Sequence, residues 1–328
     1  MTVVDVLVLL LIVAFTSVSG INDGGNLIGT YLSSSRLRPV VVVTLLLTSI
    51  LAGPLIFGTR VSHTIAVEIV DFQVAGHVVL MLSLLGAVLT LLVTWYLSIP
   101  TSTTLALAGA MVGAVLADGH LNWVHWSGIL KVLVGLVGSV VIGFGVAFVV
   151  TALLWMAMRR YPHIGFGGAR AQVLTVIFQG LAYGANDQEK AIGLTALFFL
   201  LVSHGTHYHV TPWAIVLPWF FWMVGFFTGG LRIAKTVSGH IFRLRPMQAV
   251  STQLSAAVTV ASAALLGFPV STTQTTDGSL FGTGTALHPY QVRWVTVTKF
   301  IKVWLLTLPL AIVMGALAMG VNRLVHSF

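Results

Sequence analysis

The chain has 328 residues, of which 57% are hydrophobic and only 7% are charged, and its formal net charge is +8. A soluble domain carries roughly 25% charged residues, so this chain has too few to cover a water-exposed surface, and we predict a polytopic membrane protein. The Lys and Arg residues lie mostly between apolar stretches, which argues against a nucleic-acid partner. The chain contains no cysteine, which excludes disulfides and thiolate metal sites within it.

Apolar stretches long enough to cross a bilayer follow one another along the chain, because about 20 helical residues span the hydrocarbon core. They lie near 3–19, 40–58, 74–97, 130–157, 212–230, 248–267 and 302–320. The first stretch lacks the basic start of a signal peptide and is predicted to be a retained membrane helix. Basic residues in the loops, such as Arg36 and Arg159, favour an N-terminus outside the cell, although the crossings between 99 and 129 stay unresolved.

Polar residues interrupt two of the apolar stretches. Residues 20–26 separate the first stretch from 27–34, and residues 184–190 divide the stretch 171–202. A glycine opens each interruption and permits a break in a helix, so we predict two broken helices.

Two further segments, 99–117 and 268–285, are too short and too polar for plain crossings. Each begins with a proline followed by Ser and Thr. Such segments are tolerated in a membrane where the backbone faces protein or a watery cavity, so two re-entrant hairpins are predicted.

The interruptions and hairpins recur in the same order. Residues 20–23 and 184–187 both read Gly-x-Asn-Asp, and residues 100–104 and 269–273 both read Pro-x-Ser-Thr-Thr. The offsets of the two motifs are similar, at 164 residues from Asp23 to Asp187 and 169 from Ser102 to Ser271. We predict one all-α membrane domain over 1–328 with the fold of an inverted-repeat secondary transporter. Its repeats cover approximately 15–117 and 179–285 and are joined by 118–178.

Four of the eight carboxylates lie in or beside the interrupted segments: Asp23, Asp187, Glu189 and Asp277. An ionisable group at membrane depth costs at least ~2.5–3.5 kcal/mol, so it persists where a pathway, partner or ion compensates. Asn22 and Asp23 are expected to cap the half-helix that follows the first break. Unpaired N–H groups at such a break form an anion site, while the carboxylates suit a coupled cation.

The hairpin tips are predicted to supply hydroxyl and N–H groups for a tetrahedral oxyanion, from residues 102–104 and 271–273. Phosphate keeps a proton at neutral pH and can donate it to an ionised Asp, whereas sulfate cannot. Lys190 adds a positive charge nearby.

These motifs resemble the inorganic phosphate transporter (PiT) family over nearly the whole chain. The resemblance implies a phosphate held between the two Asn-Asp breaks and the two hairpin tips, coupling to Na⁺ or H⁺, and an assembly compatible with a homodimer. The substrate-binding residues predicted from the motifs and the resemblance are Asn22, Asp23, Asn26, Ser102, Thr103, Thr104, Asn186, Asp187, Lys190, Ser271, Thr272 and Thr273. The predicted coupling residues are Asp23, Asp187, Glu189 and Asp277.

Three features of the motifs depart from the family pattern. Glu189 stands where the family usually has Gln, and Leu105 and Gln274 stand where it often has His. Gly24 and Gly25 replace bulkier residues in the first motif. Glu189 is open to three interpretations, which are a protonated side chain, an altered cation site and a changed substrate.

The sequence therefore predicts a cation-coupled secondary transporter of inorganic phosphate in the cell membrane, working by alternating access without a cofactor beyond the coupling ion. Transport of another oxyanion such as sulfate, and a channel, remain alternatives. A membrane-embedded phosphatase-type enzyme is the remote alternative, since no His lies in the four polar motifs to act as base or nucleophile. No metal other than Na⁺ is expected, and the loop residues His204, His207 and His209 are interpreted as interface residues.

Overall fold

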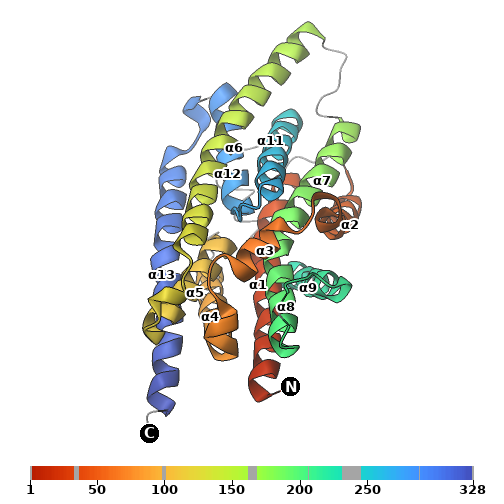
Figure 1. Cartoon of the computed structure of the whole chain (residues 1–328). Coiled ribbons are helices and arrows are strands. Elements are labelled where there is room, and N and C mark those ends of the chain that lie inside the picture. Colours follow the sequence, from red (N-terminus) through yellow and green to blue (C-terminus); the bar gives the residue numbers. More distant parts are fainter. Residues whose placement is uncertain are drawn as a thin grey trace.

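The computed structural model describes residues 2–32, 37–97, 101–161, 168–205, 207–230, 245–287 and 289–326. This part of the chain is almost entirely helical (Figure 1). The α-helices are α1 (Val3–Leu32), α2 (Pro39–Phe57), α3 (Arg60–Val67), α4 (Phe72–Tyr96), α5 (Thr103–Asp118), α6 (Trp126–Arg160), α7 (Ala169–Tyr183), α8 (Glu189–Val202), α9 (Pro212–Gly225), α11 (Pro246–Leu265), α12 (Thr272–Leu287) and α13 (Trp294–His326). Short turns of other helix types are η1 (Leu121–Trp123), η2 (Gly184–Gln188), η3 (Phe226–Gly230) and η4 (Pro289–Gln291).

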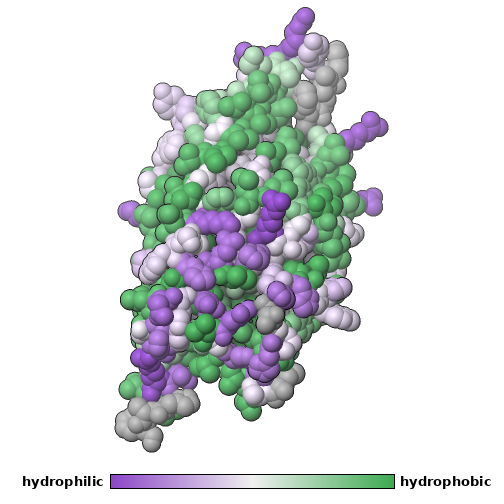
Figure 2. Space-filling model, viewed as in Figure 1, coloured by the Kyte–Doolittle hydropathy of each residue, from purple (hydrophilic) through white to green (hydrophobic). Residues whose placement is uncertain are grey.

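The prediction of an all-α polytopic membrane protein is confirmed. Within the described residues, six helical segments are long and apolar enough to cross a membrane: Val3–Gly29, Pro39–Phe57, Phe72–Tyr96, Trp126–Arg160, Pro212–Gly230 and Trp294–Val325. Hydrophobic residues cover much of the face seen in Figure 2, as expected for a surface that lies against lipid. A hydrophilic patch interrupts this surface at the level of α3.

Two helical hairpins occupy opposite halves of the molecule. Figure 1 shows α4 and α5 in the half that holds both chain termini, and α11 and α12 in the other half. The long helix α13 runs beside α5, and the long helix α6 runs beside α12. The starts of α5 and α12 lie near the middle of the molecule, which positions their first residues for a shared site.

The first hairpin returns to the side from which it starts. The backbone N–H of Asp71, just before α4, donates to the carbonyl oxygen of Trp123 at 2.9 Å, and that of His125 donates to Ile69 at 3.0 Å. Residues before α4 therefore lie against residues after α5. This answers the open question about residues 99–129, because the two arms make no net crossing.

The prediction of two broken helices is wrong for α1, which continues from Val3 to Leu32 as one α-helix. At the second motif, the helix does not break but passes through the π-helical turn η2. The glycines serve close packing instead. A Cβ on Gly20 would lie 2.0 Å from the carbonyl oxygen of Trp222, and one on Gly184 would lie 2.1 Å from that of Ile50. Glycine lets α1 approach α9, and η2 approach α2, at a distance that no other residue allows.

Candidate functional site

The central feature of the site is a pair of carboxyl groups from distant parts of the chain. Asp23 lies on α1 and Asp187 on η2, and they are 1% and 7% exposed. The carboxyl group of Asp23 lies near enough to interact with both Asp187 and Lys190. The structure therefore brings together the two Asn-Asp motifs that the sequence predicts to share a pocket.

Each carboxyl group of the pair is linked to a different hairpin. The hydroxyl of Thr273, on α12, donates to Oδ1 of Asp23 at 2.9 Å. Lys190 forms an ion pair with Oδ1 of Asp187, and its Nζ also donates to the hydroxyl of Thr103, on α5, at 3.0 Å. Both hairpins thus reach the same buried centre, although they enter from opposite halves of the molecule.

The serines after the tips cap the second arm of each hairpin. The hydroxyl of Ser102 accepts from the backbone N–H of Leu105 at 3.1 Å, and that of Ser271 accepts from Gln274 at 3.3 Å. These contacts are typical of N-cap residues, so the Ser in each motif fixes where the helix begins. The beginnings of α5 and α12 carry the positive ends of their helix dipoles into the centre of the molecule.

Several polar atoms at this centre have no hydrogen-bond partner among the described residues. They are Oδ2 of Asp23, Oδ2 of Asp187, Oδ1 of Asn22 and the hydroxyl of Thr272. Buried polar atoms in folded proteins are nearly always paired, so these four mark positions where a ligand, ion or water would complete the hydrogen bonding.

The two asparagines of the motifs have different contacts. Asn186 donates from Nδ2 to the carbonyl oxygen of Phe268 at 2.9 Å and accepts at Oδ1 from the N–H of Val270 at 3.1 Å. Its carboxamide therefore holds the tip between α11 and α12. Asn22 donates to the carbonyl oxygen of Val18 at 3.2 Å, within α1, so the expected capping of a half-helix is wrong. The side chain of Asn26 lies outside the described residues.

Thr104 connects the two tips rather than facing a free space. Its hydroxyl donates to the carbonyl oxygen of Val270 at 2.9 Å. Of the predicted hydroxyl groups, those of Thr103, Thr104 and Thr273 are therefore engaged with protein atoms, and that of Thr272 is not.

The other two predicted coupling residues make no hydrogen bond with this pair among the described residues. Glu189 is fully buried, and its Oε2 accepts from the backbone N–H of Ser62, on α3, at 3.0 Å. Asp277 on α12 is 1% exposed, and neither of its oxygens has a hydrogen-bond partner among the described residues.

The sequence analysis missed Tyr183, which lies directly before the second motif. Its hydroxyl is 2.8 Å from the hydroxyl of Thr276 and donates to the carbonyl oxygen of Thr272 at 3.3 Å. It also lies within electrostatic reach of Asp23, Asp187 and Asp277. A buried tyrosine beside a polar motif is a signal that the sequence offered, because its hydroxyl usually has a polar partner.

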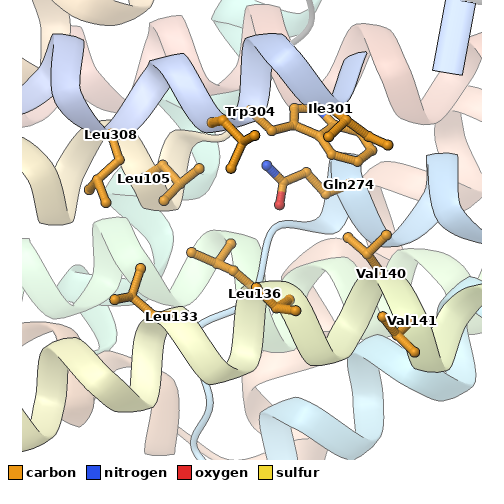
Figure 3. A pocket seen from close by; sticks show the side chains of 11 residues that line it. Leu105, Leu133, Leu136, Val140, Val141, Gln274, Ile301, Trp304 and Leu308 are labelled. Carbon is orange, nitrogen blue, oxygen red and sulfur yellow. The ribbon is translucent and has the colours of Figure 1, made fainter. Parts of the chain in front are cut away.

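A cavity of about 290 Å³ lies beside the site and not within it (Figure 3). It opens between α6 and α13, and its lining is apolar apart from Gln274 and the ring nitrogen of Trp304. Such a lining does not suit an oxyanion, because the anion would lose its hydration without gaining hydrogen bonds.

Comparisons with known proteins identify the family to which the chain belongs. Residues 19–164 and 157–315 match the phosphate transporter family. A probable low-affinity inorganic phosphate transporter of Rhizobium meliloti is 32% identical, with 92% of each chain covered. A protein of the same description from Mycobacterium bovis is 33% identical, with 96% of this chain and 76% of that protein covered.

The fold is also that of a solved structure. The structure described as the sodium-dependent phosphate transporter superposes with a TM-score of 0.85 at 22% identity, and the match covers 98% of this chain and all of the other. The matches to relatives extend over nearly the whole chain, and the apolar helices fit a multi-pass protein of the cell membrane. The chain is a member of the phosphate transporter family.

Proposed function

We propose that the chain is a secondary transporter that carries inorganic phosphate across the cell membrane together with a cation, Na⁺ or H⁺. The observation that supports this most directly is the pair Asp23 and Asp187, buried together between two hairpin tips with one carboxyl oxygen of each unpaired. The names of the relatives point to the same substrate. The name of the solved neighbour favours Na⁺ among the coupling ions.

The charges at the site support cation coupling. Two carboxyl groups face one ammonium group, that of Lys190, and no other Lys or Arg contact with them is found among the described residues. The two carboxyl groups would repel an oxyanion that entered the site unless protons or cations accompanied it, because Coulomb interactions are strong in a buried site. The composition of the site therefore supports coupled entry of a cation.

The unpaired carboxyl oxygens favour phosphate over sulfate. Oδ2 of Asp23 and Oδ2 of Asp187 are hydrogen-bond acceptors that lack a donor. A phosphate that carries a proton can supply the donor, whereas a fully ionised sulfate offers only acceptors and repulsion. The N–H groups at the starts of α5 and α12 would hold the other oxygens.

The arrangement of the hairpins suits alternating access. One hairpin enters from each half of the molecule, and both tips meet at the same centre. We propose that residues 15–117 and 179–285 form inverted repeats joined by 118–178, and that rocking of one repeat against the other opens the site to each side in turn. The chain would then act as a carrier and not as an enzyme.

The proposal is tested with purified protein in sealed vesicles. Labelled phosphate should accumulate when an inward Na⁺ gradient or an inward proton gradient is imposed, and an ionophore that collapses the active gradient should abolish accumulation. Excess arsenate should compete and excess sulfate should not. Phosphate flux that proceeds equally with no gradient would indicate a channel, and no flux under any gradient would refute transport of phosphate.

A further inference from the structure

We propose that Glu189 is a positioning residue whose buried carboxylate caps α3, so that α3 can hold the tip between α11 and α12 closed over Asp23 and Asp187. This inference rests on the proposed function, because it explains how the transport site is kept closed. It differs from a role in binding the coupling ion, which the sequence analysis considers for this residue. The argument begins with the contacts of the carboxylate.

Glu189 has no cationic partner among the described residues, although it is fully buried. The adjacent Lys190 is engaged with Asp187 and Thr103 instead. The contact that the structure gives to Glu189 is with backbone: the N–H of Ser62 donates to Oε2 at 3.0 Å. Burying a carboxyl group costs free energy unless hydrogen bonds compensate it. The bond from Ser62 provides such compensation, and the position of Ser62 in α3 explains why that N–H group is available.

The explanation lies in the first turn of α3. The N-cap residue of this helix is Thr59, and its side chain makes no capping hydrogen bond. Helix starts leave N–H groups without partners, and an N-cap side chain normally accepts from the second or third residue. Ser62 is the third residue of α3, so the carboxyl oxygen of Glu189 takes the place of the missing cap.

Helix α3 in turn holds the end of α11. The hydroxyl of Thr64 donates to the carbonyl oxygen of Gly267 at 2.9 Å, and Nη1 of Arg60 donates to that of Leu265 at 2.5 Å. Lys131 on α6 reinforces this contact, since its Nζ donates to Thr64 at 3.0 Å and pairs with Glu68 at 2.9 Å. The carbonyl groups at the end of a helix have no hydrogen-bond donors within that helix. At the end of α11, side chains of α3 supply the missing donors.

The same tip closes the proposed transport site. Asn186 binds the backbone on both sides of Pro269, and Thr104 binds the carbonyl oxygen of Val270. Three residues further on, Thr273 donates to Asp23. The tip cannot move away from Asp23 as a unit without breaking its contacts with α3. The continuous segment of η2 and α8 is therefore linked to the tip in two ways, directly through Asn186 on η2 and indirectly through the contact of Glu189 on α8 with α3.

The chain has no cysteine, so a single reporter thiol can be introduced without removing any. Val270→Cys places it at the tip, where the side chain is 1% exposed and the hydrogen bonds are made by backbone atoms. The rate of labelling by a water-soluble thiosulfonate is measured in vesicles without phosphate or gradients. Glu189→Ala should accelerate labelling about fivefold or more, the population shift that follows from losing one N-cap. Glu189→Gln keeps an oxygen acceptor and should change the rate less than about twofold.

Two controls distinguish this effect from a nonspecific destabilisation of the whole protein. Gln188 is 2% exposed, and neither of its amide atoms has a hydrogen-bond partner among the described residues, so Gln188→Ala should leave labelling unchanged. A thiol at Ala110, which is buried on α5 away from the tip, should stay unreactive in every variant. Thr64→Val removes one of the two hydrogen bonds from α3 to the end of α11 and should accelerate labelling in the same direction even if Glu189→Ala fails to fold.

Equal acceleration by Glu189→Gln and Glu189→Ala would overturn the proposal, because it would show that the charge matters and not the acceptor. Unchanged labelling in Glu189→Ala or in Thr64→Val would overturn it as well. Since labelling requires no phosphate, accelerated labelling in a protein that transports no phosphate would leave the role of Glu189 intact and reject the proposed function.

Discussion

Thr104 on α5 donates a hydrogen bond of 2.9 Å to the backbone carbonyl oxygen of Val270, so the tips of the two hairpins touch. The two residues are 166 positions apart in the chain. Their contact joins the two halves of the molecule at the level of the buried carboxyl pair. In the proposed transport cycle, opening of the site would separate these two residues, so the contact can be tested by substitution.

Thr104→Val keeps the shape of the side chain and removes its hydroxyl. We expect uptake of phosphate to fall about fivefold, because a lost hydrogen bond of roughly 1 kcal/mol would depopulate the state in which both tips meet. Initial rates of uptake in vesicles measure this. Thr104→Ser keeps the donor and should transport at close to the native rate; equal losses in the two variants would mean that the hydrogen bond is not responsible.

Removal of the Lys190 side chain leaves a buried carboxylate without its ion pair. Lys190→Met should lower the free energy of unfolding by about 3–5 kcal/mol, the usual effect of breaking a buried pair on one side. Thermal unfolding in detergent measures the loss. The double variant Lys190→Met with Asp187→Asn removes both charges and should recover most of the stability but no transport. A double variant as unstable as the single one would contradict the pairing.

Asp277 is buried, and neither of its carboxyl oxygens has a hydrogen-bond partner among the described residues, so we expect it to act in coupling. Asp277→Asn has nearly the same shape but cannot gain or lose a proton, nor attract a cation as strongly. Accumulation driven by an ion gradient should be lost, while exchange of internal for external phosphate should continue. The matched variant Thr276→Ser, one residue earlier, should retain both. Accumulation at the native level in Asp277→Asn would exclude this role.

Glu68 offers a prediction about pH outside the membrane-spanning helices. Partial burial alone would raise its pKa, but hydrogen bonds and charges from Lys131 and His63 outweigh it, so the pKa lies below the ordinary value of 4.5. A lowered pKa means that the contribution to stability is present above the ordinary value and is lost as the pH falls through the folded value. Glu68→Gln should therefore lower the unfolding temperature slightly at pH 7, by an amount equivalent to less than about 1 kcal/mol for so exposed a pair. The difference from the native protein should shrink as the pH falls below 4.5 and through the folded pKa, and a difference that does not change with pH would contradict the assignment.

Local features of the site could be predicted from the sequence. The Pro-x-Ser-Thr-Thr motifs predict where α5 and α12 begin, because Ser102 and Ser271 act on residues only three positions away. The prediction that 99–117 and 268–285 are each a whole hairpin is wrong, since each forms one arm and the preceding helix, α4 or α11, forms the other. The repeated Asn-Asp pairs predict that Asp23 and Asp187 lie together, since a repeat places equivalent residues in equivalent surroundings.

Contacts between residues that are far apart in the sequence could not be predicted in the same way. A glycine permits either a break or close packing, and only the position of Trp222 against Gly20 decides between them. Likewise, Asn186 reaches Phe268 over 82 residues, and Glu189 reaches Ser62 over 127. Their roles depend on which helices are neighbours, which the motifs do not specify.

The central claim is that Asp23 and Asp187 jointly form the site at which phosphate is carried, and uptake by their neutral variants tests it most directly. Asp23→Asn and Asp187→Asn, each reconstituted in vesicles after a check that it is folded, are compared with the native protein for accumulation of labelled phosphate under the active gradient. We predict that each variant is folded and that accumulation falls to the level of empty vesicles in both. Accumulation close to the native level in either variant would contradict the claim.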